Sequence, residues 1–533
     1  MNKSIFKVYI KNIILPCLIF SLITGILTAG IVVLYKYLAN LVINYSDQVY
    51  SFLKGNLVYL PLAIVVLLVI AIGLHYLFRF APDSKGGGIA TAIAFVRGLV
   101  TFKWLRTLIG VLFSSLITFF IGTPLGNEGP CVLAGATVGR GVISIAGKKS
   151  KAWDKYIMTG GACAGFATAT NAPISGILFA IEDAHHRLSP MILMVAGATV
   201  TFALITSHYL CLLLGVSSEL FSSLAPITLQ VSELWLPLII GITSGFFSVG
   251  FIKCLKLLRK VLSKFVKPSK KTLFILLIFI FTVILGCISE NFIGTGHHLI
   301  ESILQPASIT IFSLILALVV RFILTGAGNC SGITGGMFIP TLAFGALLSA
   351  VIAKILVSTN ILGEEYYQVI VLLGMTACFS GLTKTPLTAI VFAFEALSLS
   401  SNLLPVAIVA ISAYIVSEIF CPKSANDEIM EMRVEEEQEG KTSQLIDATV
   451  EVKENSFVVG KQIRDVLWPN NLFVLSLKRS DKRPEIDEHG EKNMYPGDVL
   501  HVRYSTYNPA QTREELIALV GEQNYTEEEC EYR

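Results

Sequence analysis

The sequence predicts an all-α polytopic membrane protein with an inverted internal repeat and broken helices, followed by a small C-terminal α/β soluble domain. Of its 533 residues, 53% are apolar and 15% are charged, whereas soluble domains carry about 25% charged residues. Apolar stretches long enough to cross a bilayer recur as far as residue 420. After Cys421 the sequence becomes charged and rich in Gln and Glu, which indicates that the chain leaves the membrane there.

The membrane part is expected to hold at least ten spans. They are predicted at 12–36, 56–79, 99–123, 190–215, 235–254, 272–293, 308–326, 338–357, 366–380 and 402–420. The Gly/Pro-interrupted stretches 126–146 and 160–182 are candidates for further embedded segments. Lys3, Lys7 and Lys11 precede the first apolar run and place the N-terminus in the cytoplasm. That run is too long for a signal peptide, so it reads as a first span.

The remainder of the chain divides by composition. We expect a transmembrane domain at 1–426, a linker at 427–445, a cytosolic domain at 446–520 and an acidic tail at 521–533, with both termini cytoplasmic. Alternating residues predict strands at 447–453, 472–478 and 498–504, and helical patterns occur at 460–466 and 511–520.

Charge is divided unevenly between these parts. Residues 427–533 hold 24 acidic and 13 basic residues, a formal −11, which leaves +14 for residues 1–426. A positive membrane domain concentrates anions at its entrances. Basic residues also gather in cytoplasmic loops whatever the substrate, so topology explains this charge equally well.

Several functional classes have no support in the sequence. The ten cysteines are scattered singly, and His185-His186 and His297-His298 have no third ligand nearby. The chain has no nucleotide-binding glycine loop, no HExxH and no Ser/His or paired-Asp constellation at suitable spacing. It also lacks a TVGYG-like filter, which argues against a cation-channel subunit. We therefore expect no enzyme activity, metal, cofactor or nucleic-acid partner.

An internal repeat runs through the membrane part. Residues 161–182 match residues 374–395 in pattern at an offset of 213, and both stretches contain a Pro followed nine residues later by a Glu. Residues 126–130 align with 336–340 at an offset of 210. Many transporters with such repeats aim the N-termini of broken helices at an ion near the membrane midplane.

The stretch 126–130, Gly-Asn-Glu-Gly-Pro, is the strongest candidate for a functional site. It sets the carboxylate of Glu128 between glycines at a predicted helix start, because Pro130 suits the first turn of a helix. A charged side chain within a membrane is costly, so it marks a functional site by default. Backbone N–H groups at the helix start would face an anion beside it. A structural helix cap is the alternative interpretation of Glu128.

Together these motifs resemble the CLC family of chloride channels and proton-coupled anion antiporters. Gly86 to Ala90 is similar to the GSGIP motif of that family, 126–130 to its G(K/R)EGP and 336–340 to its GxFxP. Residues 171–183 also resemble the family, and the likeness covers about residues 10–430 in order. Residues 446–520 resemble the TrkA C-terminal type of ligand-binding domain.

The resemblance implies a homodimer with one anion pathway in each subunit. Glu128 matches the external gating glutamate, whose carboxylate occupies an anion position and leaves it when protonated. Asp183 lies where antiporters of the family carry an internal proton acceptor. Glu182 competes for that role, and an ion pair with Arg187 is the alternative for either acid.

The resemblance also implies an anion path with departures from the family. The family serine is Gly87 here, the tyrosine that donates to the central anion is replaced by Asn426, and a basic residue is replaced by Asn127. Backbone N–H groups and the amide of Asn426 still offer donors. The residues expected to line the path are Gly87, Gly88, Asn127, Gly129, Met337, Phe338, Ile339 and Asn426.

The sequence therefore predicts a chloride/proton antiporter in a bacterial inner (plasma) membrane. A passive chloride channel and a fluoride/proton antiporter are the alternatives, and Asn127 resembles the fluoride-exporting branch. The domain at 446–520 is either a sensor for a ligand, such as the nucleotide cyclic di-AMP, or a dimerisation module. Expected partners are thus chloride or another small anion, protons, membrane lipid and a second copy of the chain.

Overall fold

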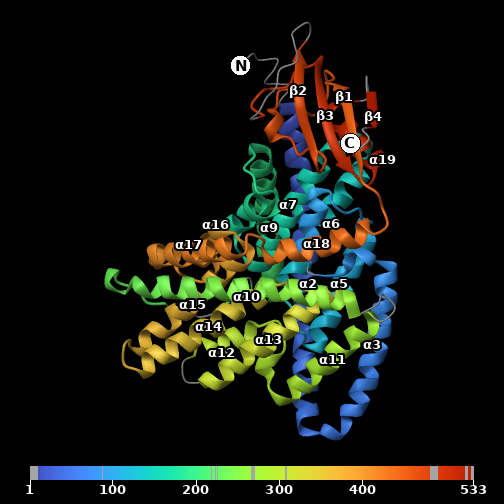
Figure 1. Ribbon diagram of the computed structural model, residues 1–533. Helices are drawn as coiled ribbons and strands as arrows, with labels where there is room; N and C mark the ends of the chain where they lie inside the picture. Colours follow the sequence, from blue (N-terminus) through green and yellow to red (C-terminus); the bar gives the residue numbers. More distant parts are fainter. Residues whose placement is uncertain are drawn as a thin grey trace.

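A computed structural model places a small sheet on one end of a large helical body (Figure 1). The structure describes residues 10–86, 88–217, 219–221, 224, 226–265, 271–305, 309–479, 490–521 and 526–529. Within these ranges, eleven helices are long and apolar enough to cross a membrane. The predicted polytopic helical fold is confirmed.

The helical body consists of seventeen α-helices among the described residues. They are α2 (Leu15–Gly55), α3 (Leu60–Phe80), α4 (Ile89–Arg97), α5 (Trp104–Ile121), α6 (Glu128–Ala146), α7 (Asp154–Thr170), α8 (Pro173–Phe179), α9 (Pro190–Leu214), α10 (Trp235–Phe265), α11 (Lys271–Ile288), α12 (His297–Ile303), α13 (Ile311–Ser331), α14 (Phe338–Ser358), α15 (Tyr367–Thr383), α16 (Pro386–Ala396), α17 (Leu403–Phe420) and α18 (Ala425–Gln438).

Helices α2 and α10 extend beyond the predicted spans, and α6 adds a further one. The first apolar run is predicted to end at residue 36, but α2 is 41 residues long and ends at Gly55. The second half of α2 is more polar than the first, but it contains no Gly or Pro between residue 36 and Gly55 that would end the helix earlier. The stretch 126–146, set apart in the sequence because of its glycines, forms α6 and is itself long and apolar enough to span.

The repeat predicted from sequence is an inverted repeat in space. Gly126 and Gly336 form an antiparallel bridge, in which each N–H donates to the other carbonyl at 2.7 Å. Breaks between helices also correspond, since Asn171 (φ 55°) ends α7 and Lys384 (φ 63°) ends α15 in left-handed conformation. A proline then starts α8 and α16, where its fixed φ suits the first helical turn.

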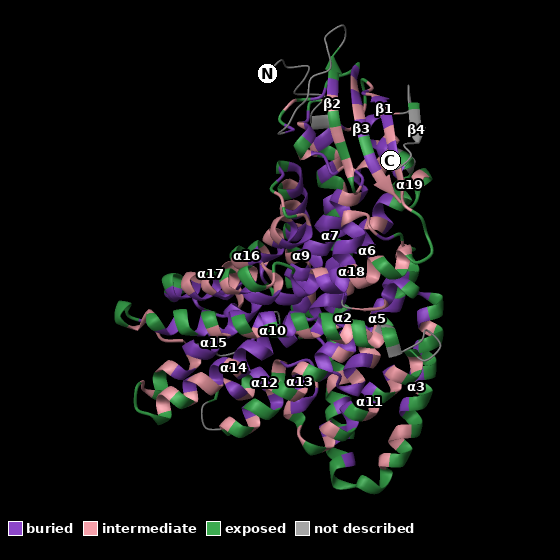
Figure 2. Ribbon diagram, in the orientation of Figure 1, coloured by how far each residue is buried: buried purple, intermediate pink, exposed green. Residues whose placement is uncertain are grey.

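Helix pairs within each repeat pack with their backbones almost in contact. A Cβ added to Gly135 of α6 would lie 2.0 Å from the carbonyl oxygen of Gly161 of α7. The equivalent pair in the second repeat is Gly345 of α14 and Gly374 of α15, where the Cβ would lie 2.2 Å from the carbonyl oxygen. Small residues permit such close packing in membranes. Figure 2 shows α6 and α7 largely buried at the centre of the body.

The C-terminal part forms a four-stranded antiparallel sheet. Its strands are β1 (Gln444–Glu451), β2 (Leu472–Arg479), β3 (Asp498–Thr506) and β4 (Thr526–Glu529), in the order β2-β3-β1-β4. Helix α19 (Pro509–Val520) follows β3. We call the described residues from 444 to 529 the sheet unit. Most of its buried apolar side chains form a core of their own, whereas Leu467 belongs to the core of the helical body.

One local expectation for the sheet unit was wrong. The stretch 460–466 forms only a 3-10 turn at Ile463–Asp465. Its backbone instead pairs with residues 490–494, because Gly460 (φ 78°) turns the chain and the N–H of Ile463 donates to the carbonyl of Lys492. The acidic tail supplies β4, which pairs with β1. As an edge strand, β4 needs no apolar face, so its composition concealed it.

Candidate functional site

Three helix N-termini meet around one cavity in the helical body. The cavity measures about 20 Å³ and is lined by Ile89 at the start of α4, Phe338 at the start of α14 and Asn426 at the start of α18. This volume holds a single water-sized particle. Helix N-termini carry unpaired N–H groups and a partial positive charge, so their convergence suits a small anion.

The start of α6 adjoins the same place through its glycines. A Cβ on Gly88 would lie 2.2 Å from the carbonyl carbon of Gly129, and one on Gly129 would lie 2.5 Å from the Cα of Gly336. Gly88 also has φ 32°, which disfavours other residues. Glycine at these positions therefore lets the three loops that precede α4, α6 and α14 pack against one another.

Glu128 is the first residue of α6, and only 1% of it is exposed. Its Oε1 lies 3.6 Å from Nε2 of His297. Its Oε2 has no hydrogen-bond partner in the part of the chain that the structure describes. A buried carboxylate oxygen without a partner is costly, which makes a purely structural cap a poor account of Glu128.

His297 is a site residue that the sequence analysis did not find. It begins α12, directly after Gly296 (φ 116°), and it is about one quarter exposed. The buried guanidinium of Arg321 holds the preceding loop by donating to the carbonyls of Asn291 and Gly294. From the sequence alone this His-His pair is a candidate only for metal binding, because no pattern reveals that Glu128 lies opposite His297.

Asp183 and Asn426 lie together on the wall of the cavity. The Asn426 amide donates to Oδ2 of Asp183 at 3.0 Å, and both residues are buried. Arg97 fixes the backbone here, because its guanidinium donates to the carbonyls of Asp183 and Ala184 at 2.9 and 2.7 Å. Part of the hydrogen-bonding capacity of Asn426 is thus directed to Asp183.

The other predicted path residues come from the same helix starts. Met337 and Phe338 line the cavity. Ile339 and Asn127 are buried at the starts of α14 and α6 and are not among the residues that line it. Gly87 lies outside the described residues.

Glu182 and Arg187 have other contacts than those considered from the sequence. The Glu182 carboxylate accepts from the backbone N–H groups of Leu387 and Thr388 at the start of α16. The guanidinium of Arg187 donates to the carbonyl of Val466 in the sheet unit. Among the described ion pairs, Arg187 pairs with neither Glu182 nor Asp183.

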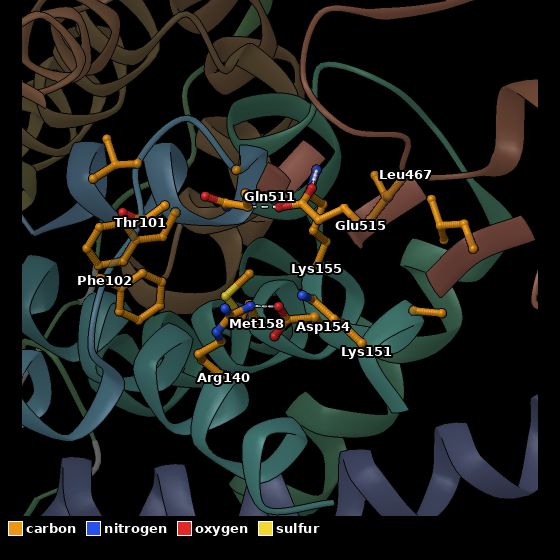
Figure 3. Close-up of a pocket in the computed structure, with 15 residues that line it drawn as sticks. Thr101, Phe102, Arg140, Lys151, Asp154, Lys155, Met158, Leu467, Gln511 and Glu515 are labelled. Atoms are coloured by element: carbon orange, nitrogen blue, oxygen red, sulfur yellow. Dashed lines mark hydrogen bonds and ion pairs between the residues drawn. The ribbon is translucent and has the colours of Figure 1, made fainter. Parts of the chain in front are cut away.

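The sheet unit contacts the helical body at the N-terminal end of α7. The hydroxyl of Tyr156 donates to the carbonyl of Asp465 and accepts from the N–H of Leu467. Lys155 lies 3.1 Å from the Glu515 carboxylate of α19. Figure 3 shows Gln511, Glu515 and Leu467 of the sheet unit around the same pocket as Lys155. The sheet unit is therefore joined to the helix that follows α6.

Fold and site together define a polytopic membrane protein whose inverted repeats bring helix N-termini to one buried carboxylate. Residues 70–418 match the family described as voltage gated chloride channel. The chain therefore belongs to the voltage gated chloride channel (CLC) family.

Individual relatives agree with this assignment. The chain is 27% identical over 426 residues to the H(+)/Cl(-) exchange transporter ClcA of Vibrio cholerae serotype O1, covering 75% of this chain and 86% of the relative. Its fold is similar to that of a slow cyanobacterial Cl-/H+ antiporter, with TM-score 0.69, 23% identity and coverage of 78% and 98%. A CLC-type fluoride/proton antiporter gives TM-score 0.62 at 22% identity, with the same coverage.

Proposed function

We propose that this protein is an antiporter that exchanges chloride for protons across a bacterial inner membrane, with Glu128 as gate and proton carrier. The observation that carries the proposal is the environment of Glu128: a buried carboxylate at converging helix N-termini, with one oxygen unpartnered and the other 3.6 Å from His297. The names of relatives, which include H(+)/Cl(-) exchange transporters, support the same activity.

The chemistry follows from competition for the same N–H groups. A charged carboxylate and a halide both favour the positive helix ends, so they exclude each other there. Protonation removes the charge of Glu128, which lets an anion take the position and carries one proton with the side chain. Nε2 of His297 lies 3.6 Å from Oε1 of Glu128, and the imidazole is about one quarter exposed whereas the carboxylate is buried, so His297 can pass protons from solvent to Glu128.

The substitution Glu128→Gln tests the gate. The amide mimics the protonated acid, so liposomes carrying the variant should still pass chloride under a chloride gradient but should move no protons. Glu301→Gln, at an exposed position on α12, is the matched control and should retain both fluxes. Proton movement retained by Glu128→Gln contradicts the gate assignment. Chloride flux without protons in the wild type would make the protein a passive channel.

Fluoride is a second candidate substrate because of Asn127. This residue is buried beside Glu128, and its Oδ1 has no hydrogen-bond partner among the described residues. The structural likeness to a fluoride/proton antiporter concerns the fold alone. Repeating the same flux measurement with fluoride and nitrate ranks the anions, and proton movement only with fluoride would replace chloride in the proposal.

We further propose Asp183 as the inner proton station. Its burial on the cavity wall and its hydrogen bond to Asn426 support this role. The substitution Asp183→Asn should reduce proton flux while chloride flux persists. Unchanged coupling in that variant would assign the inner step to another group.

We propose that the sheet unit is a regulatory cytosolic domain and that both chain termini are cytoplasmic. A polar pocket of about 100 Å³ lies between it and the helical body, with amides from Asn470, Asn471 and Gln511 on its wall. Such amides suit a nucleotide base, for which cyclic di-AMP is the first probe. Calorimetric titration of the full chain with cyclic di-AMP should give a saturable signal. A flat trace would leave a dimerisation module.

We also propose that the protein is a homodimer. Ile174 of α8 and Leu387 of α16 are 55% and 60% exposed, and these two short helices lie against each other. Light scattering of the detergent-solubilised protein, corrected for bound detergent, should give twice the chain mass. A single chain mass would contradict the proposal.

A further inference from the structure

Residues 465–468 of the sheet unit, which we call the docking turn, are bound by the helical body. The hydroxyl of Tyr156 donates to the carbonyl of Asp465 at 3.1 Å and accepts from the N–H of Leu467 at 2.9 Å. Tyr156 is fully buried, and Leu467 is 6% exposed within the core of the helical body. Breaking these contacts would leave buried polar groups unpaired, so the docking turn is held firmly against α7.

The loop that follows Asp183 binds the same turn. We call residues 183–189 the station loop. The guanidinium of Arg187 in this loop donates to the carbonyl of Val466 at 3.0 Å, and the hydroxyl of Ser189 donates to another carbonyl of the docking turn at 3.3 Å. The sheet unit therefore contacts the helical body four residues along the chain from Asp183.

The station loop is short and internally bonded, so a displacement at Arg187 reaches Asp183. Residues Ala180–Ala184 form a π-helical turn that contains Asp183. The N–H of Arg187 donates to the carbonyl of Ile181 in this turn at 3.1 Å. Single π turns are frequent at functional sites. The guanidinium that binds the docking turn and the carboxylate of Asp183 thus belong to one hydrogen-bonded unit, which Arg97 holds from α4.

The opposite wall of the central cavity comes from the second repeat. Met337 and Phe338 lie at the start of α14, and in the described part of the chain no hydrogen bond or ion pair joins them to the sheet unit. A change at the docking turn therefore acts on the side of the cavity that holds Asp183, while the start of α14 keeps its position. Proton flux is thus expected to respond more strongly than chloride flux.

We propose that Tyr156 and Arg187 are positioning residues for the inner proton step. Tyr156 fixes the docking turn to α7, and Arg187 ties the station loop to that turn. The sheet unit thereby sets the placement of the Asp183 carboxylate and, with it, the number of protons moved per chloride. This role rests on the proposed antiport and on Asp183 as the inner proton station.

Proton and chloride fluxes measured on the same liposomes test this role. Arg187→Met keeps the length of the side chain but removes its donors, so the protons moved per chloride should fall about twofold or more while chloride flux persists. Arg187→Lys retains a donor for the Val466 carbonyl and should recover at least part of the wild-type ratio. Tyr156→Phe removes only a hydroxyl, should lower the ratio in the same way, and serves if Arg187→Met does not fold.

Lys151→Gln is the matched control. Lys151 pairs with Glu514 of the sheet unit at 2.6 Å across the same boundary, and among the described residues it has no hydrogen bond to the station loop. This variant should keep the wild-type ratio of protons to chloride.

Amide hydrogen exchange of residues 183–189 in the full chain, in neutral detergent, gives a readout that needs no transport. Exchange should be faster in Arg187→Met than in the wild type and unchanged in Lys151→Gln, because a turn opens more often when it loses contacts. Unchanged exchange, an unchanged flux ratio, or an equal fall of both fluxes in the Arg187→Met and Tyr156→Phe variants overturns the positioning role. Wild-type liposomes that pass chloride without protons would instead contradict the proposed antiport, and this role with it.

Discussion

Helices α8 and α16 cap each other through two glutamates, and this arrangement predicts a matched pair of stability losses. Glu182 accepts from the N–H groups of Leu387 and Thr388 at 3.0 and 2.7 Å. Glu395 accepts from the N–H groups of Ile174 and Ser175 at 2.8 and 2.9 Å. In each case the hydroxyl of the Thr or Ser also donates at 2.7 Å. Each carboxylate thus accepts three charge-assisted hydrogen bonds.

The size of the loss is bounded by these contacts. A helix N-cap is worth about 1 kcal/mol, and a hydrogen bond to a charged group about 1.5–3 kcal/mol. Both helix starts are partly exposed, so water replaces part of what is removed. We therefore expect Glu182→Ala and Glu395→Ala each to lower the free energy of unfolding by about 2–4 kcal/mol.

Unfolding in mixed micelles of neutral detergent and dodecyl sulfate, followed by circular dichroism, measures both variants. Glu301→Ala, an exposed acid on α12, is the control and should change the midpoint little. The two capping variants should agree within about 1 kcal/mol because their contacts are equivalent. A large loss in one variant and none in the other would refute the reciprocal cap.

Three further predictions concern single side chains. The substitution His297→Gln should keep chloride flux but slow proton flux, because the amide side chain cannot pass a proton to Glu128. Proton and chloride fluxes measured on the same liposomes check this, and an unchanged proton flux would remove His297 from the proton route. Burial lowers the pKa of Lys461 to about 7, so between that pH and about 10.4 the unfolded state binds more protons than the folded state, and the stability of the sheet unit should rise with pH across this window. The substitution Lys461→Met should abolish this rise, which proteolytic cleavage of the full chain in urea measures. A rise of the same size in the variant would show another cause. The substitution Gly135→Ala should destabilise the protein by about 3 kcal/mol or prevent it from folding, because the new Cβ would lie 2.0 Å from a facing carbonyl oxygen. The control Gly30→Ala, at a position where nothing lies within 4 Å of the added Cβ, should be neutral or stabilising. Equal unfolding midpoints for the two variants would contradict the packing argument.

Much of the fold could be predicted because its signals are local. Apolar runs located the membrane-embedded helices, and the repeat at offsets of 210 and 213 predicted which loops would correspond in space. The start of α6 at Glu128 and the restarts at Pro173 and Pro386 follow from glycine and proline chemistry near each position. These features need only neighbouring residues to be recognised.

The contacts that the sequence could not reveal join distant segments. His297 faces Glu128 across 169 positions, and Asn426 meets Asp183 across 243. No periodicity or spacing encodes such pairs, because their geometry arises only when both repeats have folded. Strand β4 was missed for a different reason, because an acidic sequence at the edge of a sheet gives no apolar pattern.

The near-contact of Gly135 with Gly161, and of Gly345 with Gly374, has a consequence for how the protein can move. With main chain resting on main chain, α6 can neither roll nor slide on α7 without a collision, and α14 is confined by α15 in the same way. Access to the central cavity must then change by small rotations of individual side chains, not by rocking of whole helices. Any larger rearrangement would have to carry each glycine-matched pair as one rigid block.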